Sequence, residues 1–237
     1  MIAYLRRAGA RRKRPAVFLD RDGTINHNRP GAYLTHPRGL KFYAEAFEAL
    51  RLLADLGYLL IVVSNQSGVG RGYMTLAGSK AINMKLVAGL RARGVALDGV
   101  YFCPHRPEDK CRCRKPGRGL ADEALRRHAI DLSRSLVIGD KVSDMKLADA
   151  LGVRAIFLKS GEGRGQLKKH PGELKGRLVK PGLLAAARWL KVIAGGCRSG
   201  VLPGSGFFAF PRRPAGSKKP DTRHPSNYTR RQPPYNL

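Results

Sequence analysis

Short apolar runs alternate with amphipathic segments along the central part of the chain. The apolar runs are rich in Val, Ile, Leu and Phe, and their length and continuity are typical of strands buried on both faces of a parallel sheet. We expect these strands at residues 16–19, 58–63, 98–102, 136–138 and 153–158. Apolar positions at helical spacing predict helices at residues 45–56, 75–93, 120–128, 145–151 and 183–194. This alternation predicts an α/β fold with a doubly wound parallel sheet.

The two ends of the chain lack this periodicity. Residues 1–14 form a basic arm, and residues 195–237 combine Pro, Arg, Ser and Gly without regular apolar spacing. Segments of such composition bury too little apolar surface to offset the entropy lost on ordering. We therefore expect one folded domain at residues 15–194, between a disordered arm and a disordered tail.

The chain carries a formal net charge of +28, and the basic excess extends through both ends and the central domain. Such an excess favours partners that carry phosphate, either nucleic acid or a small polyanionic substrate. We favour the small substrate, because no segment resembles a known nucleic-acid-reading motif. No run approaches the roughly 18 apolar residues of a membrane span, and residues 1–7 contain no apolar signal-peptide core. We expect a cytoplasmic monomer without a membrane partner.

Polar side chains follow three of the predicted strands at the point where each strand ends. Asp20 and Asp22 follow the first strand, Ser64 follows the second, and Asp140 follows the fourth. The carboxyl ends of parallel strands share one edge of the sheet, where open α/β folds bind their ligands. Asp20 and Asp22 are two residues apart, so an extended backbone directs both to the same side. Two close carboxylates need a cation, and Mg²⁺ is the usual one beside a phosphate.

These residues are suited to phosphoryl transfer through an aspartyl-phosphate. We predict that Asp20 attacks phosphorus, and that Asp22 protonates the leaving oxygen and then activates water. Ser64 and Lys115, the latter in an Arg-Lys-Pro run, are expected to bind the phosphoryl oxygens. The predicted Mg²⁺ ligands are Asp20 and Asp140 with a main-chain carbonyl, and we count Asp22 with this metal site.

The quoted residues resemble the four motifs of the haloacid dehalogenase superfamily of phosphatases. The motifs are Asp20-Arg21-Asp22-Gly23-Thr24, Ser64, Lys115 and Gly139-Asp140-Lys141-x-x-Asp144. Asp144 either supports the metal site or is a helix-start carboxylate favoured by the helix dipole. The resemblance covers residues 16–160 and makes the central domain a phosphatase domain. No long insertion follows the first strand or separates the second from the third, as in the capless members.

A cysteine-rich loop narrows the resemblance to fewer branches of this superfamily. Its potential metal ligands are Cys103, His105, Cys111 and Cys113. Three thiolates and one imidazole complete a tetrahedral Zn²⁺ site without an open position, which is typical of a structural zinc. Without a secretion signal, the clustering favours metal binding over disulfides. The zinc would brace the loop that delivers Arg114 and Lys115.

Such a zinc loop on a capless phosphatase is similar to two branches of the superfamily, one acting on a heptose 1,7-bisphosphate and one on histidinol phosphate. The segment Ser64–Gly72 and the run Gly139-Asp140-Lys141 resemble the heptose branch. The resemblance implies a Mg²⁺-dependent sugar-phosphate phosphatase that releases the C7 phosphate. Histidinol phosphate or another small phosphate monoester is the alternative substrate. A nucleic-acid-end phosphatase and a nucleic-acid-binding protein are further alternatives.

The resemblance also implies substrate contacts for Asn65, Arg114 and Lys141. That Arg71 faces a second phosphate is our own prediction, and a solvated surface arginine is the alternative. The loop His27–Tyr33 departs from the family pattern, so the sequence determines the reaction more firmly than the substrate.

Overall fold

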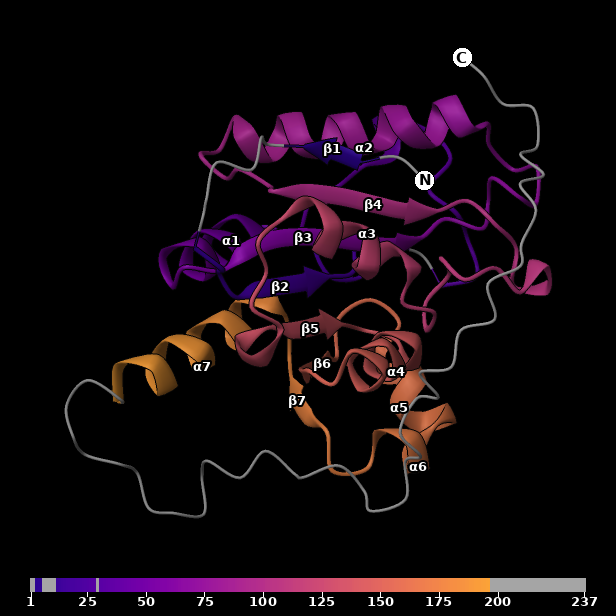
Figure 1. The fold of residues 1–237 in the computed structure, drawn as a ribbon. Helices are drawn as coiled ribbons and strands as arrows, with labels where there is room; N and C mark the ends of the chain where they lie inside the picture. The colour runs from indigo at the N-terminus through magenta and orange to yellow at the C-terminus, as the bar shows by residue number, and fades with distance from the viewer. Residues whose placement is uncertain (1–2, 6–11, 29, 197–237) are drawn as a thin grey trace, which may run out of the picture.

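The computed structural model describes residues 3–5, 12–28 and 30–196, which form an α/β fold around one sheet (Figure 1). The sheet has seven strands in the order β1-β4-β3-β2-β5-β6-β7. Five neighbouring pairs are parallel, and the edge strand β1 runs antiparallel to β4. The strands are β1 Ala3–Leu5, β2 Ala16–Leu19, β3 Leu59–Asn65, β4 Gly99–Cys103, β5 Leu136–Gly139, β6 Arg154–Leu158 and β7 Leu178–Lys180.

Strand β2 lies inside the sheet, and all four of its residues are fully buried. It pairs in parallel with β3 on one side and with β5 on the other. Its side chains alternate between two hydrophobic cores, because successive side chains of a strand point to opposite faces. Val17 and Leu19 enter one core, and Ala16 and Phe18 enter the other.

Helices cover both faces of the sheet. Helices α1, α2 and α7 contribute to the core that contains Val17, whereas α3, α4 and α6 contribute to the core that contains Phe18. The helices are α1 Ala46–Asp55, α2 Leu76–Arg91, α3 Gly119–Arg127, α4 Val142–Leu151, α5 Gly163–Lys169, α6 Pro171–Leu174 and α7 Leu183–Gly196. The predicted doubly wound α/β fold is thereby confirmed.

Local signals in the sequence set the helix ends. The Thr75 hydroxyl accepts a hydrogen bond from Gly78 N at 3.0 Å and so caps the start of α2. Gly57 follows α1 with φ of +88°, and Gly152 ends α4 with φ of +72°, a left-handed conformation that side chains disfavour. No helix within the described ranges is both long and apolar enough to cross a bilayer.

Four short elements differ from the sequence-based prediction. Ala3–Leu5 lies in the arm that we expected to be disordered, but it forms β1 by pairing its backbone with the free edge of β4. Strand β7 and helices α5 and α6 lie in the segment after residue 158, for which we predicted nothing before α7. Elements of three to seven residues are too short to show a period. Residues 197–237 of the predicted tail lie outside the described residues.

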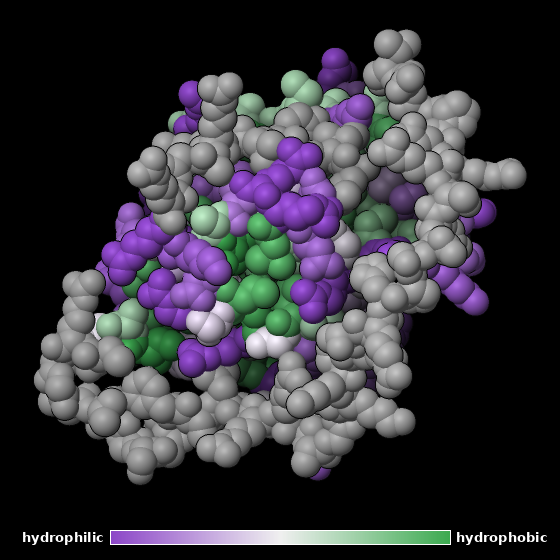
Figure 2. Space-filling model, in the orientation of Figure 1, coloured by the Kyte–Doolittle hydropathy of each residue, from purple (hydrophilic) through white to green (hydrophobic). Residues whose placement is uncertain are grey.

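The described surface is largely hydrophilic on the face shown in Figure 2, around a central strip of hydrophobic residues. Among the described residues, the large apolar side chains that are exposed are Tyr33, Tyr73, Leu76, Met84 and Val192. Tyr33 and Tyr73 contact each other, with ring centroids 5.1 Å apart.

Candidate active site

Three buried carboxylates meet at the carboxyl edge of the sheet. Asp20 follows β2, Asp140 follows β5, and Asp144 lies in the first turn of α4. One oxygen from each of the three lies within 4.8 Å of the others. The main chain helps to set this arrangement, because Asp20 N donates to Ile138 O at 3.0 Å. We call these three residues the carboxylate cluster.

Three glycines, two in loops and one at the end of β5, pack directly against the carboxylate cluster. A Cβ atom at Gly23 or at Gly161 would lie 2.2 Å from Asp140 Oδ2, and one at Gly139 would lie 2.2 Å from Asp144 Oδ2. Gly23 also has φ of +87°, which side chains rarely adopt. The glycine of the Asp-Gly-Thr motif therefore both turns the chain and leaves room for the acid beside it.

The ammonium group of Lys115 joins two members of the cluster. Lys115 Nζ lies 2.8 Å from Asp20 Oδ1 and 2.6 Å from Asp144 Oδ1, and it donates to Val63 O at 2.7 Å. Burial lowers the pKa of Lys115, but the Asp144 and Asp20 carboxylates outweigh burial and raise it above its usual value. Lys115 therefore remains charged although only 3% of its surface is exposed.

The cluster still contains more negative charge than Lys115 balances. Burial, followed by the charges of Asp20 and Asp144, raises the pKa of Asp140 well above its usual value. Burial also raises the pKa of Asp144 to about 6, although Lys115 opposes the shift. Asp140 Oδ1 is buried and has no hydrogen-bond partner within the described part of the chain. Hard oxygen donors with a free lone pair and excess negative charge suit a divalent cation such as Mg²⁺.

The side chain of Asp22, which we counted with the metal site, lies in a hydrogen-bond network separate from the carboxylate cluster. Both of its oxygens accept hydrogen bonds from Arg21, and further ones come from Asn26 at 2.9 Å and Gln66 at 2.8 Å. Burial raises the pKa of Asp22, but the Arg21 charge and these hydrogen bonds together bring it below its usual value. The third carboxylate beside Asp20 and Asp140 is that of Asp144.

Ser64 and Asn65 end β3 beside this network. Ser64 is 2% exposed, and its hydroxyl accepts a hydrogen bond from Gln66 Nε2 at 2.8 Å. Asn65 Nδ2 donates to Lys115 O at 3.1 Å, and Lys115 N donates to Asn65 Oδ1 at 2.9 Å. Asn65, which we predicted to contact substrate, thus also ties the Lys115 loop to the end of β3.

A cavity of about 1010 Å³ opens over this edge of the sheet. Arg114 and Lys141 line it, together with Asp22 and Asn65. Arg71 is not among the lining residues, and its guanidinium forms an ion pair with Glu108 at 3.0 Å near the surface. The structure places the Arg71 guanidinium beside Glu108 and not at the cavity, and its contact with a second phosphate stays a prediction.

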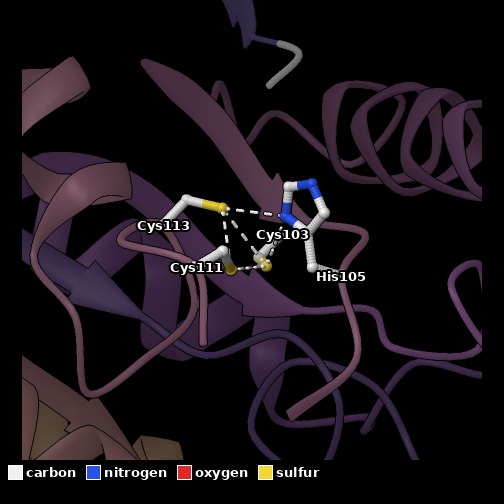
Figure 3. Close-up of side chains that lie close together, drawn as sticks. All are labelled: Cys103, His105, Cys111 and Cys113. Atoms are coloured by element: carbon white, nitrogen blue, oxygen red, sulfur yellow. Dashed lines mark hydrogen bonds between the residues drawn. The ribbon is translucent and has the colours of Figure 1, made fainter. Parts of the chain in front are cut away.

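The four predicted zinc ligands converge at the end of β4 and in the loop that follows it (Figure 3). The three sulfur atoms lie 3.3 to 3.5 Å from one another, and His105 Nδ1 lies 3.2 Å from Cys113 Sγ. Hydrogen bonds of Cys103 and the nearby histidine and thiol groups lower the pKa of Cys113 to about 5. Three thiols and one imidazole nitrogen at such distances suit a tetrahedral Zn²⁺.

The loop Ser160–Glu162 also belongs to the site, although no motif in the sequence pointed to it. Ser160 Oγ donates to Gly23 O at 2.7 Å, and Glu162 N donates to Asp140 Oδ2 at 2.7 Å. Glu162 Oε1 also lies 2.8 Å from Lys141 Nζ. The position of this loop could have identified it. It follows β6, which is parallel to β5, so it lies at the same sheet edge as the loops that we predicted to form the site.

Comparisons with known proteins agree with this geometry. The model of the HAD-hydrolase-like family matches residues 112–186, which include Lys115 and the acids of α4 and its N-terminal loop. The chain is 45% identical to the D-glycero-β-D-manno-heptose-1,7-bisphosphate 7-phosphatase of Helicobacter pylori strain J99 over 131 residues, 55% of this chain and 74% of that enzyme. It is 38% identical to the enzyme of that name from Haemophilus ducreyi over 155 residues, 62% of this chain and 84% of that enzyme.

A solved structure shows the same fold. The D,D-heptose 1,7-bisphosphate phosphatase of B. bronchiseptica, in complex with magnesium and phosphate, aligns with a TM-score of 0.70 and 30% sequence identity. The alignment covers 76% of this chain and 99% of that chain. The fold, the acids at the strand ends and these similarities agree on a phosphoric monoester hydrolase. This chain belongs to the HAD-like hydrolases and, among them, to the family of these heptose-bisphosphate phosphatases.

Proposed function

We propose that the chain hydrolyses the C7 phosphate ester of D-glycero-D-manno-heptose 1,7-bisphosphate, in the cytoplasm and as a monomer. The observation that carries the reaction type is the ion pair of Lys115 with the candidate nucleophile Asp20, 2.8 Å apart and almost fully buried. The similarity to the Helicobacter and Haemophilus enzymes supports the substrate.

Each residue of the site has its own role in the reaction. Asp20 attacks phosphorus in line and becomes an aspartyl-phosphate, while the oxygen of the sugar leaves with a proton from Asp22. Asp22 then takes a proton from the water that attacks the aspartyl-phosphate, which frees Asp20 and releases phosphate. Lys115 and Ser64 bind the phosphoryl oxygens and stabilise the charge that develops on them.

Two metal ions are part of this proposal. Asp20, Asp140 and a main-chain carbonyl would hold Mg²⁺, and Asp144 would support that site. When bound, Mg²⁺ offsets the negative charge of the carboxylates and of the phosphoryl group. The unpartnered Asp140 Oδ1 and the raised pKa of Asp140 support this assignment. The cluster of Cys103, His105, Cys111 and Cys113 would hold a structural Zn²⁺.

A panel of phosphate esters tests the substrate. The purified protein with Mg²⁺ is given the heptose bisphosphate, histidinol phosphate and a 3′-phosphorylated oligonucleotide, and phosphate release is measured for each. We expect the highest kcat/KM with the heptose bisphosphate. Faster turnover of histidinol phosphate would support the alternative small-molecule substrate, and faster turnover of the oligonucleotide would support a nucleic-acid-end phosphatase.

Two arginine variants form a matched pair for the same assay. Arg114 lines the cavity, whereas Arg71 is paired with Glu108 outside it. We expect Arg114→Ala to raise KM about tenfold or more, because an arginine contact to phosphate is a charge-assisted hydrogen bond. Arg71→Ala is expected to change kcat/KM less than about twofold, because exposed ion pairs contribute little. A larger effect of Arg71→Ala would contradict its placement.

Zinc removal is expected to disable the active site through the loop that carries Lys115. Cys113 and Lys115 are two residues apart, so loss of the metal releases the segment that places Lys115 beside Asp20. We expect Cys113→Ser to lose bound zinc and to lower kcat by about a hundredfold, comparable to losing an oxyanion-stabilising donor. Zinc content and phosphate release check the prediction. A zinc-free variant with normal kcat would contradict the positional role.

A further inference from the structure

A network of buried polar side chains contacts the Asp22 carboxylate. Arg21 is fully buried, and its guanidinium binds the Asp22 carboxylate through two groups. Arg21 Nε donates to Asp22 Oδ1 at 3.1 Å, and Arg21 Nη2 donates to Asp22 Oδ2 at 2.7 Å. A planar guanidinium that binds both oxygens fixes the plane of the carboxylate as well as its position.

Two further side chains hold the guanidinium in turn. Arg21 Nη1 donates to Asn83 Oδ1 at 2.8 Å, and Arg21 Nη2 donates to Gln66 Oε1 at 3.0 Å. Asn83 lies in α2 and is fully buried, and its Nδ2 has no hydrogen-bond partner among the described residues. Because a guanidinium only donates, the Asn83 atom that faces it is the oxygen. Asn83 thus serves this network as an acceptor.

Gln66 lines the cavity and links Arg21 to Asp22. Its Nε2 donates to Asp22 Oδ2 and to Ser64 Oγ, both at 2.8 Å. Asp22 and Gln66 both line the cavity, whereas Asn83 and Arg21 do not. The network therefore leads from helix α2, outside the cavity, to an acid that lines the cavity.

We propose that Asn83 and Arg21 are positioning residues that aim the Asp22 carboxylate at the leaving oxygen of the substrate. This inference rests on the proposed role of Asp22 as the catalytic acid and base. Without the Asn83 oxygen, the guanidinium loses its hydrogen-bond acceptor on α2 and turns away from the orientation that matches Asp22. Displacing a reacting group by about 1 Å costs on the order of a hundredfold in rate.

Variants of one residue separate this role from a merely structural one. Asn83→Leu removes the acceptor at similar volume, whereas Asn83→Asp keeps an acceptor oxygen toward Arg21. Ser79→Ala is the matched control, because Ser79 lies one turn earlier on α2, is fully buried, and has a hydroxyl without a hydrogen-bond partner among the described residues. If Asn83→Leu does not fold, Asn83→Ala serves the same test.

The test measures kcat and KM with two substrates of different leaving group. The heptose bisphosphate releases an alkoxide that needs a proton, whereas p-nitrophenyl phosphate releases a stable anion that needs little acid catalysis. We expect Asn83→Leu to lower kcat for the sugar phosphate about thirtyfold to a hundredfold with KM nearly unchanged, and to lower the p-nitrophenyl rate less than about threefold. Asn83→Asp and Ser79→Ala are expected to stay within about threefold of the parent protein for both substrates.

A crystal structure of Asn83→Leu supplies the second readout, in which the Asp22 carboxylate is expected to occupy a new orientation. Equal losses with both substrates, or an unmoved Asp22 with normal kcat, would overturn the inference. The variant Asp22→Asn distinguishes failure of the proposed function of Asp22 from failure of the positioning role. If Asp22→Asn retains normal turnover, the proposed function of Asp22 has failed. If it loses turnover while Asn83→Leu does not, only the positioning role has failed.

Discussion

Asp20→Asn is expected to abolish phosphate release while the protein remains folded. The substitution removes the nucleophile, and loss of a covalent catalyst costs on the order of 10⁴-fold or more in kcat. The fold should tolerate it, because the Asp20 charge contributes to the raised pKa values of Asp140 and Asp144. Neutralising Asp20 relieves that repulsion, and Lys115 keeps Asp144 as its partner at 2.6 Å.

Two measurements decide this prediction. Phosphate release from the heptose bisphosphate gives the loss of kcat, and urea denaturation without metal gives a midpoint that should be no lower than that of the parent protein. Asp149→Asn is the matched control, because it makes the same change at an exposed carboxylate paired with Arg177, and it should leave kcat unchanged. Turnover above about a thousandth of the parent rate by Asp20→Asn would rule out Asp20 as nucleophile.

Lys115→Met is expected to damage both activity and stability. Methionine has a similar length but no charge, so the Asp20 and Asp144 carboxylates lose a cation that lies within 2.8 Å of each. Breaking a buried ion pair by removing one partner costs about 3–5 kcal/mol. The phosphoryl oxygens also lose a donor, which lowers kcat by about 10²- to 10³-fold.

A second substitution separates these two effects. Lys115→Met/Asp144→Asn removes one of the two carboxylates that the single variant leaves unbalanced, so the free energy of unfolding should recover most of its loss. The rate should not recover, because the phosphoryl oxygens still lack the ammonium group. Urea denaturation and phosphate release measure the two quantities on the same samples. A double variant that regains activity would show that Lys115 acts only by stabilising the fold.

The fold follows from the sequence wherever an element is long enough to show a period. The apolar runs Ala16–Leu19 and Leu59–Val63 have no polar position, because helices cover both faces of the sheet. Strand β1 gave no comparable signal, since its position depends on the free edge of β4 rather than on its own three residues. Long-range pairing of short segments is thus the part of the fold that local pattern does not predict.

The site follows from the sequence where a residue ends a strand. Asp20, Ser64 and Asp140 were found in this way, because the end of a parallel strand fixes the position of the next side chain. The partner of each side chain is less predictable. Asp22 binds Arg21 rather than the carboxylate cluster, and Arg71 binds Glu108 rather than facing the cavity. In both cases a nearby opposite charge determines where the side chain lies. The spacing of residues along the chain does not reveal which charge will be nearby.

The hydrogen bond between Ser160 and Gly23 spans 137 positions of the chain, and that between Lys115 and Asp20 spans 95. During synthesis the nucleophile therefore emerges long before the residues that surround it, and the nascent chain completes the site only after β6 and its loop have been made. Contacts of such sequence separation form late and slowly. Phosphatase activity consequently reports that the chain has folded at least through the loop after β6, since no N-terminal fragment that ends before residue 160 contains Asp20, Lys115, Asp140 and Ser160 together.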